Sequence, residues 1–153
     1  MCSTRVHDVF TGWHTRRPLT RAVEARYREG VSQDREIKAR FRWGVLLVTD
    51  DESSETIPSW PTDDAQVATS RTAIVVKVLH EVDGVVCVHV GTQRPHPEGI
   101  VAFDGTLDVP SGRLRVSDAD GESAIVVDVP AGHVPLRIVC DRAHDAAYVD
   151  VIL

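Results

Sequence analysis

Hydrophobic residues occupy every second position from residue 37 to about residue 48, a period typical of a half-buried β-strand. One face of this strand is hydrophobic and consists of Ile37, Ala39, Phe41, Trp43, Val45 and Leu47. The other face begins with basic residues, namely Lys38, Arg40 and Arg42. We therefore expect one continuous strand over residues 37–48, with its basic face in solvent.

Two runs rich in β-branched residues, 72–80 and 85–91, flank the pair Asp83-Gly84. An Asp-Gly pair between such runs is typical of a two-residue type I′ turn, in which glycine accommodates the positive φ. We therefore predict an antiparallel hairpin at the centre of a packed sheet, because both of its faces are largely apolar.

From residue 100 onward, short hydrophobic runs alternate with turns rich in glycine and proline. This spacing predicts an all-β fold, an antiparallel β-sandwich of about eight strands over residues 37–153. We place the last strand, 148–152, at a sheet edge, and Pro135 at an edge or a bulge, because proline cannot donate a ladder hydrogen bond. The predicted core includes Phe41, Val76, Val78, Val88, Ile125 and Leu136.

Residues 1–36 form a separate, basic N-terminal extension in this interpretation. Residues 20–29 favour a short helix, in which Val23 and Tyr27 share one face, and Gly30 follows it. Two apolar side chains bury little surface, so such a helix would be marginal by itself. The extension is either a segment that contacts an acidic partner or nucleic acid, or a frayed leader, or the product of translation from a start codon placed too early.

The charge is distributed unevenly along the chain of 153 residues. Residues 1–44 hold ten Lys and Arg against five Asp and Glu, a net of +5, whereas residues 45–153 hold seven against eighteen, a net of −11. An acidic body repels nucleic acid and attracts basic surfaces, so we expect a protein partner and no direct nucleic-acid binding by residues 45–153.

The chain has no apolar run near the ~18 residues that a membrane-spanning helix needs, so no membrane partner is expected. The first ten residues lack the apolar block of a secretory signal, which favours a cytoplasmic protein. Three cysteines at unrelated spacings (Cys2, Cys87, Cys140) indicate reduced thiols and no disulfide framework.

The long polar segment 49–71 is the predicted interaction site. It contains six carboxylates and a tryptophan, and the residues expected to contact a partner are Asp50, Asp51, Glu52, Trp60, Asp63 and Asp64. Trp60 either anchors the loop to the sandwich or presents an aromatic hot spot to a partner.

No catalytic motif appears, and no catalytic residue, metal or other cofactor is predicted. One arrangement resembles a zinc site: the predicted hairpin places His80 opposite Cys87, with His89 one diagonal step away. The same face is mostly apolar, which favours a core instead. Residues 117–123 carry alternating carboxylates like a calcium loop, but an ordinary hairpin connection explains them better.

The order of these pieces resembles the competence protein J family, small inhibitors of the DNA-entry nuclease in transformable bacteria. The matching features are the strand 37–48, Trp60-x-x-Asp63, the runs 72–80 and 85–91, the segment 103–116, the turn 128–132 and the closing strand 148–152. The resemblance covers roughly residues 37–153 and implies a β-sandwich that acts as a protein inhibitor, without catalytic residues.

Three functions follow as hypotheses. The first is a non-enzymatic, acidic inhibitor or immunity-like protein that binds a basic partner such as a nuclease. The second is a small-ligand or carbohydrate-binding module with Trp43 or Trp60 as a stacking platform. The third is an enzyme that uses the His80, Cys87 and His89 cluster. The inhibitor needs exposed carboxylates, whereas the ligand module needs a concave pocket lined by tryptophan.

Overall fold

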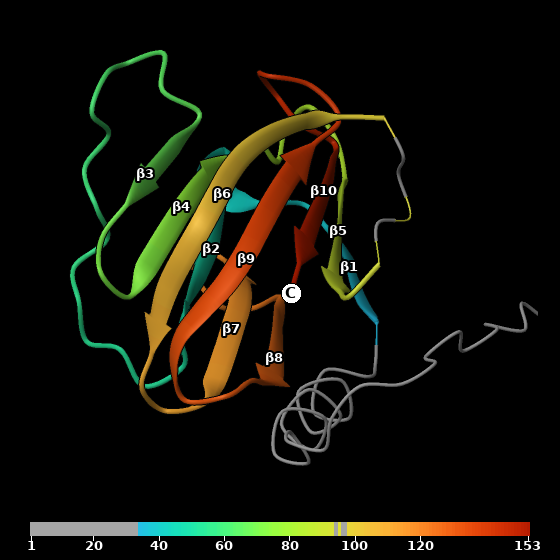
Figure 1. The fold of residues 1–153 in the computed structure, drawn as a ribbon. Helices are drawn as coiled ribbons and strands as arrows, with labels where there is room; N and C mark the ends of the chain where they lie inside the picture. Colours follow the sequence, from blue (N-terminus) through green and yellow to red (C-terminus); the bar gives the residue numbers. More distant parts are fainter. Residues whose placement is uncertain (1–33, 94, 96–97) are drawn as a thin grey trace, which may run out of the picture.

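Two five-stranded sheets pack face to face in the computed structural model, which describes residues 34–93, 95 and 98–153 (Figure 1). The first sheet has the order β1 (Arg35–Ala39), β5 (Val86–Gly91), β10 (Tyr148–Ile152), β9 (Gly132–Cys140), β6 (Ile100–Val109). The second has the order β3 (Val67–Thr69), β4 (Ala73–Lys77), β2 (Val45–Asp50), β7 (Arg113–Asp118), β8 (Ala124–Asp128). The predicted all-β sandwich is therefore confirmed, with ten strands in the part of the chain that the structure describes.

Neighbouring strands run antiparallel except for β5 and β10, which are parallel. The core lies between the sheets and is built almost entirely from valine, leucine and isoleucine. All six residues predicted for the core are buried, namely Phe41, Val76, Val78, Val88, Ile125 and Leu136.

The predicted strand over residues 37–48 is wrong in its middle. It divides into β1, a short 3₁₀ turn η1 (Arg42–Gly44) and β2, and the chain passes there from the first sheet to the second. Consecutive positive φ angles at Trp43 (56°) and Gly44 (60°) reverse the backbone direction. The buried face consequently changes from odd to even positions, so that Leu46 and Val48 enter the core in place of Val45 and Leu47.

The predicted hairpin over residues 72–91 is also wrong, because β4 and β5 belong to different sheets. Near the connection the backbone amides of Asp83 and Gly84 both donate to the carbonyl of His80, at 2.9 and 3.3 Å. Gly84 does not have the positive φ of a type I′ turn. Strands apolar on both faces suit the interior of either sheet, so their pattern did not determine which sheet each one joins.

The last strand lies in the middle of its sheet and not at an edge, since β10 pairs with both β5 and β9. Its pairing with β9 covers Arg137–Cys140 only, so Pro135 has a β6 neighbour on one side and lies beyond the end of β10 on the other. This local edge position is the one predicted for Pro135.

Residues 118–123 form the connection of the β7–β8 hairpin, as expected from their polar sequence. The Oδ1 of Asp118 accepts from the amide of Ser123 at 3.3 Å, and Gly121 has a φ of 71°. The helix predicted at 20–29 and most of the basic extension 1–36 lie outside the described residues, and β1 begins at Arg35.

Candidate functional site

Asp50 ends β2 and is only 3% exposed. Its two carboxylate oxygens accept from the backbone amides of Glu52 and Ser111, at 2.8 and 2.9 Å. Asp50 therefore fastens the start of the long loop to the β6–β7 turn and does not present its charge at the surface.

Asp51 is also bound within the protein, by ion pairs with two arginine side chains. Its carboxylate lies 2.8 Å from Nη2 of Arg113 and 3.3 Å from Nη1 of Arg115, and its side chain is 12% exposed. Glu52, by contrast, is exposed. Of the first three predicted carboxylates, only Glu52 is therefore open to a partner.

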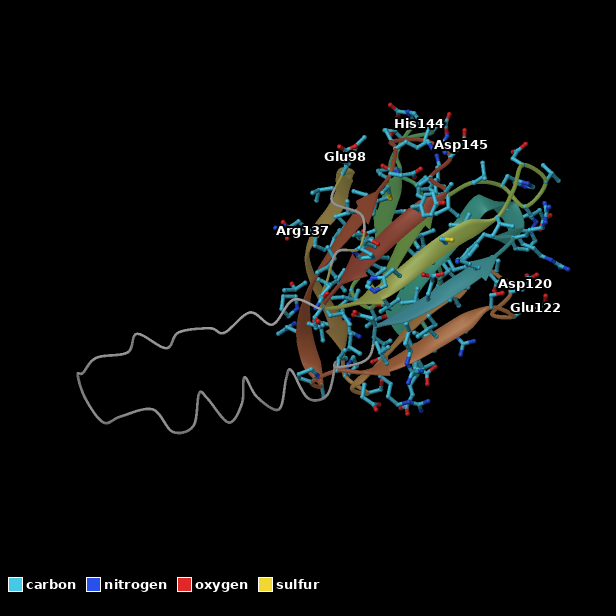
Figure 2. All side chains as sticks on the ribbon, turned by 90° about the vertical axis from the view of Figure 1, so that its right-hand side faces the viewer. Glu98, Asp120, Glu122, Arg137, His144 and Asp145 are labelled. Carbon is cyan, nitrogen blue, oxygen red and sulfur yellow. The ribbon has the colours of Figure 1, made fainter. Side chains whose placement is uncertain are left out.

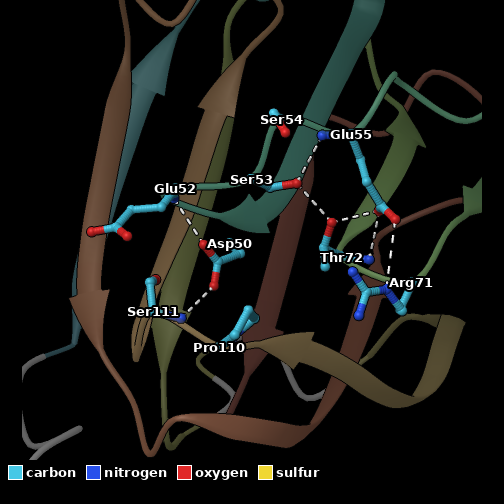
Figure 3. Close-up of a pocket in the computed structure, with 9 residues that line it drawn as sticks. All are labelled: Asp50, Glu52, Ser53, Ser54, Glu55, Arg71, Thr72, Pro110 and Ser111. Atoms are coloured by element: carbon cyan, nitrogen blue, oxygen red, sulfur yellow. Dashed lines mark hydrogen bonds and ion pairs between the residues drawn. The ribbon is translucent and has the colours of Figure 1, made fainter.

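Glu55 organises the next part of the loop (Figure 3). Its Oε2 accepts from the amide and the hydroxyl of Thr72, at 2.9 and 2.5 Å, and from the hydroxyl of Ser70 at 2.8 Å. The side-chain and backbone hydrogen bonds from Thr72 hold the pKa of Glu55 below its ordinary value. Glu55 and Thr72, together with Arg71 and Ser53, line a polar pocket of about 350 Å³.

Trp60 attaches the far part of the loop to β4. The Nζ atom of Lys77 lies 4.7 Å from the centroid of its ring and donates to the carbonyl of Asp63. A hydrogen bond from the Thr62 side chain lowers the pKa of Asp64, as does one from its own backbone amide. This cation–π contact matches the anchoring alternative for Trp60.

The predicted site residues fall into two groups at opposite ends of the second sheet. In the β2–β4 pairing Thr49 lies opposite Ala73 and Val45 opposite Lys77, four steps apart, or about 13 Å at the rise of a strand. Residues 50–52 lie at the first end, and Trp60, Asp63 and Asp64 lie toward the second. Figure 1 shows the long loop running between these ends, outside β3.

A pocket at the second end was not predicted from the sequence. It has a volume of about 220 Å³ and is lined by Trp43, Gly44, Val45, Trp60, Lys77, Val78, His80 and Asp145. The alternating pattern predicts Trp43 on the hydrophobic face of a continuous strand, but its side chain is 67% exposed. The Trp43-Gly44 pair was the available signal, because glycine after an alternating run marks a possible reversal.

At Gly44, the backbone of the η1 turn packs against the segment that follows β4. Its carbonyl accepts from the amide of Val78 at 2.8 Å, and a Cβ at this position would lie 2.7 Å from the Val78 carbonyl oxygen. Only glycine fits both this approach and the positive φ without strain. Phe41 before the turn and Gly44 at its end are buried, whereas Trp43 between them is exposed.

Asp145 is the carboxylate that lines this pocket, and further acidic side chains lie on the connections at the same end of the sandwich. We define the Trp43 end as η1 together with residues 60–66, 79–85, 118–123 and 141–147. Its carboxylates include Asp63, Asp64, Glu81, Asp83, Asp120, Glu122 and Asp145. Figure 2 shows Asp120 and Glu122 on the β7–β8 connection, and His144 and Asp145 on the β9–β10 connection. Arg42 pairs with Asp120 at 2.8 Å and with Glu81 at 4.0 Å.

His80, Cys87 and His89 do not have the arrangement that the predicted hairpin implies for a zinc site. His80 lies in the connection after β4, and its Nδ1 accepts from the amide of Val82 at 3.3 Å. Cys87 and His89 lie on β5, which pairs with β1 and β10 and not with β4. Among the described residues, no group of three or more His, Cys, Asp or Glu side chains could hold a metal ion.

The fold of this chain is similar to that of a solved structure. The structure of ComJ, an inhibitor of the DNA-degrading activity of NucA from Bacillus subtilis, superposes with a TM-score of 0.56. The chain is similar in fold to ComJ. The match covers 77% of this chain and 94% of ComJ at 14% sequence identity, so it shows the fold alone. The resemblance to the competence protein J family is thereby confirmed at the level of structure.

A second structure, described as crocagin biosynthetic gene J, matches with a TM-score of 0.42 and 15% identity over 78% of this chain and 94% of that one. No family model matches the sequence, and no curated protein matches it. Across the part of the chain that the structure describes, no helix is long and apolar enough to span a membrane.

Proposed function

We propose that this protein is a non-enzymatic inhibitor that binds a basic protein, such as a nuclease, and blocks its active site. The similarity in fold to ComJ carries this proposal. The net charge of −11 over residues 45–153 supports it, because a nuclease surface that binds DNA is basic.

Carboxylates would take the place of DNA phosphates against the basic residues of the partner. Of the residues predicted for this contact, Glu52, Asp63 and Asp64 are exposed and available. Hydrogen bonds lower the pKa of Asp64, which keeps its carboxylate ionised well into the acid range. Asp50 and Asp51 would act indirectly, by holding the loop in its conformation.

The direct test is an assay of the DNA-degrading activity of NucA with increasing amounts of the full chain. Inhibition that saturates near one equivalent and weakens as salt is added is the expected result. An unrelated acidic protein of similar net charge serves as the control. NucA activity unchanged at a large excess of this protein, at low salt, would contradict NucA as the target. A basic nuclease of the protein's own host should then be assayed in the same way.

A ligand-binding module is the second candidate, since the pocket at the Trp43 end is lined by two tryptophans. Its volume of about 220 Å³ is below the roughly 300–1,000 Å³ of ordinary ligand sites. Lys77 also lies over the ring of Trp60, where a sugar would stack. Titration with mono- and disaccharides, followed by tryptophan fluorescence, would show saturable binding if this candidate were right.

A further inference from the structure

Two residues with strained backbones meet in one pocket. Trp43 (φ 56°) and Asp145 (φ 49°) are the non-glycine residues with positive φ in the described part of the chain, and both line the pocket at the Trp43 end. Such angles are costly for residues with a side chain and are found preferentially at functional sites. They come from the β1–β2 and β9–β10 connections, which are far apart in the sequence.

The same end exposes large hydrophobic side chains. Trp43 is 67% exposed, and Val82 and Val85 in the neighbouring connection are 75% and 49% exposed. This connection packs on η1, because the backbone of Val78 and His80 lies against Gly44 and the guanidinium of Arg40 donates to the carbonyl of Glu81 at 2.6 Å. An exposed tryptophan on a fixed backbone is typical of a binding hot spot.

The rim of this apolar centre is negatively charged. Asp63, Asp83 and Asp145 make no ion pair with any cation in the described residues, so their charges are available to a partner. The fixed cation of the pocket, Lys77, is engaged with Trp60 and with the carbonyl of Asp63. An apolar centre with a carboxylate rim is complementary to a protein surface whose hydrophobic patch is flanked by arginine and lysine.

We infer that the Trp43 end is the surface through which this protein binds its basic partner, with Trp43 as the anchor. An arginine or lysine of the partner would lie on the exposed face of the Trp43 ring, while Asp63, Asp83 and Asp145 face the surrounding basic side chains. The inference rests on the proposed function, and it assigns the main contact to a residue outside the long loop.

The surface can be located with a simple probe before the natural partner is known. The full chain, labelled with ¹⁵N, is titrated with a short peptide of alternating arginine and leucine while its amide resonances are followed. The largest shifts are expected at the Trp43 end, in residues 42–44, 60–66, 79–85, 118–123 and 141–147. Shifts that concentrate instead around the Glu55 pocket, on the outer face of the first sheet, or evenly over the surface would overturn the inference.

Trp43→Asn is the central variant, because asparagine tolerates positive φ and should preserve the turn. It should weaken peptide binding by about tenfold, the size expected for loss of a hot spot. Trp43→Tyr should restore most of the affinity. The matched control is Ile57→Asn, which removes a side chain of similar exposure (53%) that does not line the pocket. Equal effects of the Trp43 and Ile57 changes would contradict an anchor at Trp43.

Assays with NucA separate this inference from the proposed function. If NucA is not inhibited but the peptide binds at the Trp43 end, NucA is not the target, and the inference that this end is the binding surface stands. If NucA is inhibited equally well by wild type and by Trp43→Asn, the inference is wrong and the inhibitor function stands. Saturable binding of a sugar in the Trp43 pocket, without peptide binding there, would replace the protein partner by a small ligand.

Discussion

Glu55 accepts hydrogen bonds from both the backbone amide and the hydroxyl of Thr72, at 2.9 and 2.5 Å, and so joins the middle of the long loop to the start of β4. The residues lie 17 positions apart in the sequence. This pair gives a long polar segment a defined conformation, although the segment contributes few side chains to the core.

Glu55→Gln should loosen the loop, because a neutral amide accepts less strongly than a carboxylate. Limited proteolysis should then cut residues 51–66 faster in the variant than in the wild type, while the denaturant midpoint of the whole domain changes little. Glu52→Gln is the control, since Glu52 is exposed. Equal cleavage rates in all three proteins would show that Glu55 does not hold the loop.

The contribution of Glu55 should also depend on pH. Its pKa is lowered in the folded protein, so its stabilising effect is fully present above the ordinary value of 4.5 and is lost as the pH falls through the lowered value. The difference in cleavage rate between wild type and Glu55→Gln, measured with an acid-active protease, should therefore disappear in strong acid. A difference that stayed constant from neutral pH to strong acid would contradict this.

Asp50→Ala should destabilise the domain by about 1–3 kcal/mol, because it leaves the amides of Glu52 and Ser111 without their acceptor. Asp50→Asn keeps one acceptor oxygen and should cost less. Equilibrium denaturation of the two variants measures this order. If both were as stable as the wild type, the buried carboxylate would have no structural role.

Gly44→Ala should be destabilising by at least about 1–2 kcal/mol, since alanine resists a φ of 60° and its Cβ would clash with the Val78 carbonyl. Trp43→Gly, at the adjacent position, should leave stability nearly unchanged, because release of strain offsets the loss of a mostly exposed side chain. Thermal denaturation of both variants is the measurement. A large loss of stability in Trp43→Gly would indicate that Trp43 is held by packing and not by the turn.

Charge at the Trp43 end should control the rate of association with the basic partner. Replacing Asp63, Asp64 and Asp145 together by asparagine should slow association roughly tenfold at low salt and flatten its salt dependence. The control removes the same number of charges elsewhere, through Glu36→Gln, Asp104→Asn and Asp128→Asn. Stopped-flow binding to the inhibited nuclease compares them. Equal slowing by both sets would mean that net charge, and not its location, drives association.

The two described cysteines should differ in reactivity. Burial raises the pKa of the Cys140 thiol to about 12, and the carboxylates of Asp141 and Asp150 contribute to the shift. It therefore stays protonated at neutral pH and unreactive, whereas Cys87 is partly exposed. Brief treatment with iodoacetamide, followed by peptide mass spectrometry, should modify Cys87 first. Earlier modification of Cys140 would contradict its burial.

Local patterns predicted the strands well and their partners poorly. The core residues Val76 and Val88 were identified because β-branched runs bounded by turns are distinctive. The sheet to which each run belongs depends on long-range packing, since an Asp-Gly pair fits a crossing between sheets as well as a hairpin. Trp43 was misplaced for a similar reason: alternation continues in the sequence while the backbone reverses at Gly44.

For the candidate site, the sequence predicted which types of residue take part but not where they lie relative to one another. It indicated an acidic loop around Trp60, but the loop spans two ends of a sheet. The buried carboxylate of Asp50 accepts hydrogen bonds from two backbone amides and is therefore not available to a partner. The pocket shared by Trp43 and Asp145 joins segments about a hundred residues apart, which no local pattern can reveal. The cytoplasmic location and the division at residue 36 stay predictions.

The central place of β10 in the first sheet has a consequence for how the protein is made. β10 follows the other nine strands in the sequence, yet it lies between β5 and β9. During synthesis β1 can pair with β5, and β6 with β9, but the strand that pairs with both β5 and β9 is missing until Tyr148–Ile152 leave the ribosome. Nascent chains would therefore display the unpaired edges of β5 and β9, and a frameshift or stop codon shortly before β10 should yield an aggregating product rather than a smaller folded domain.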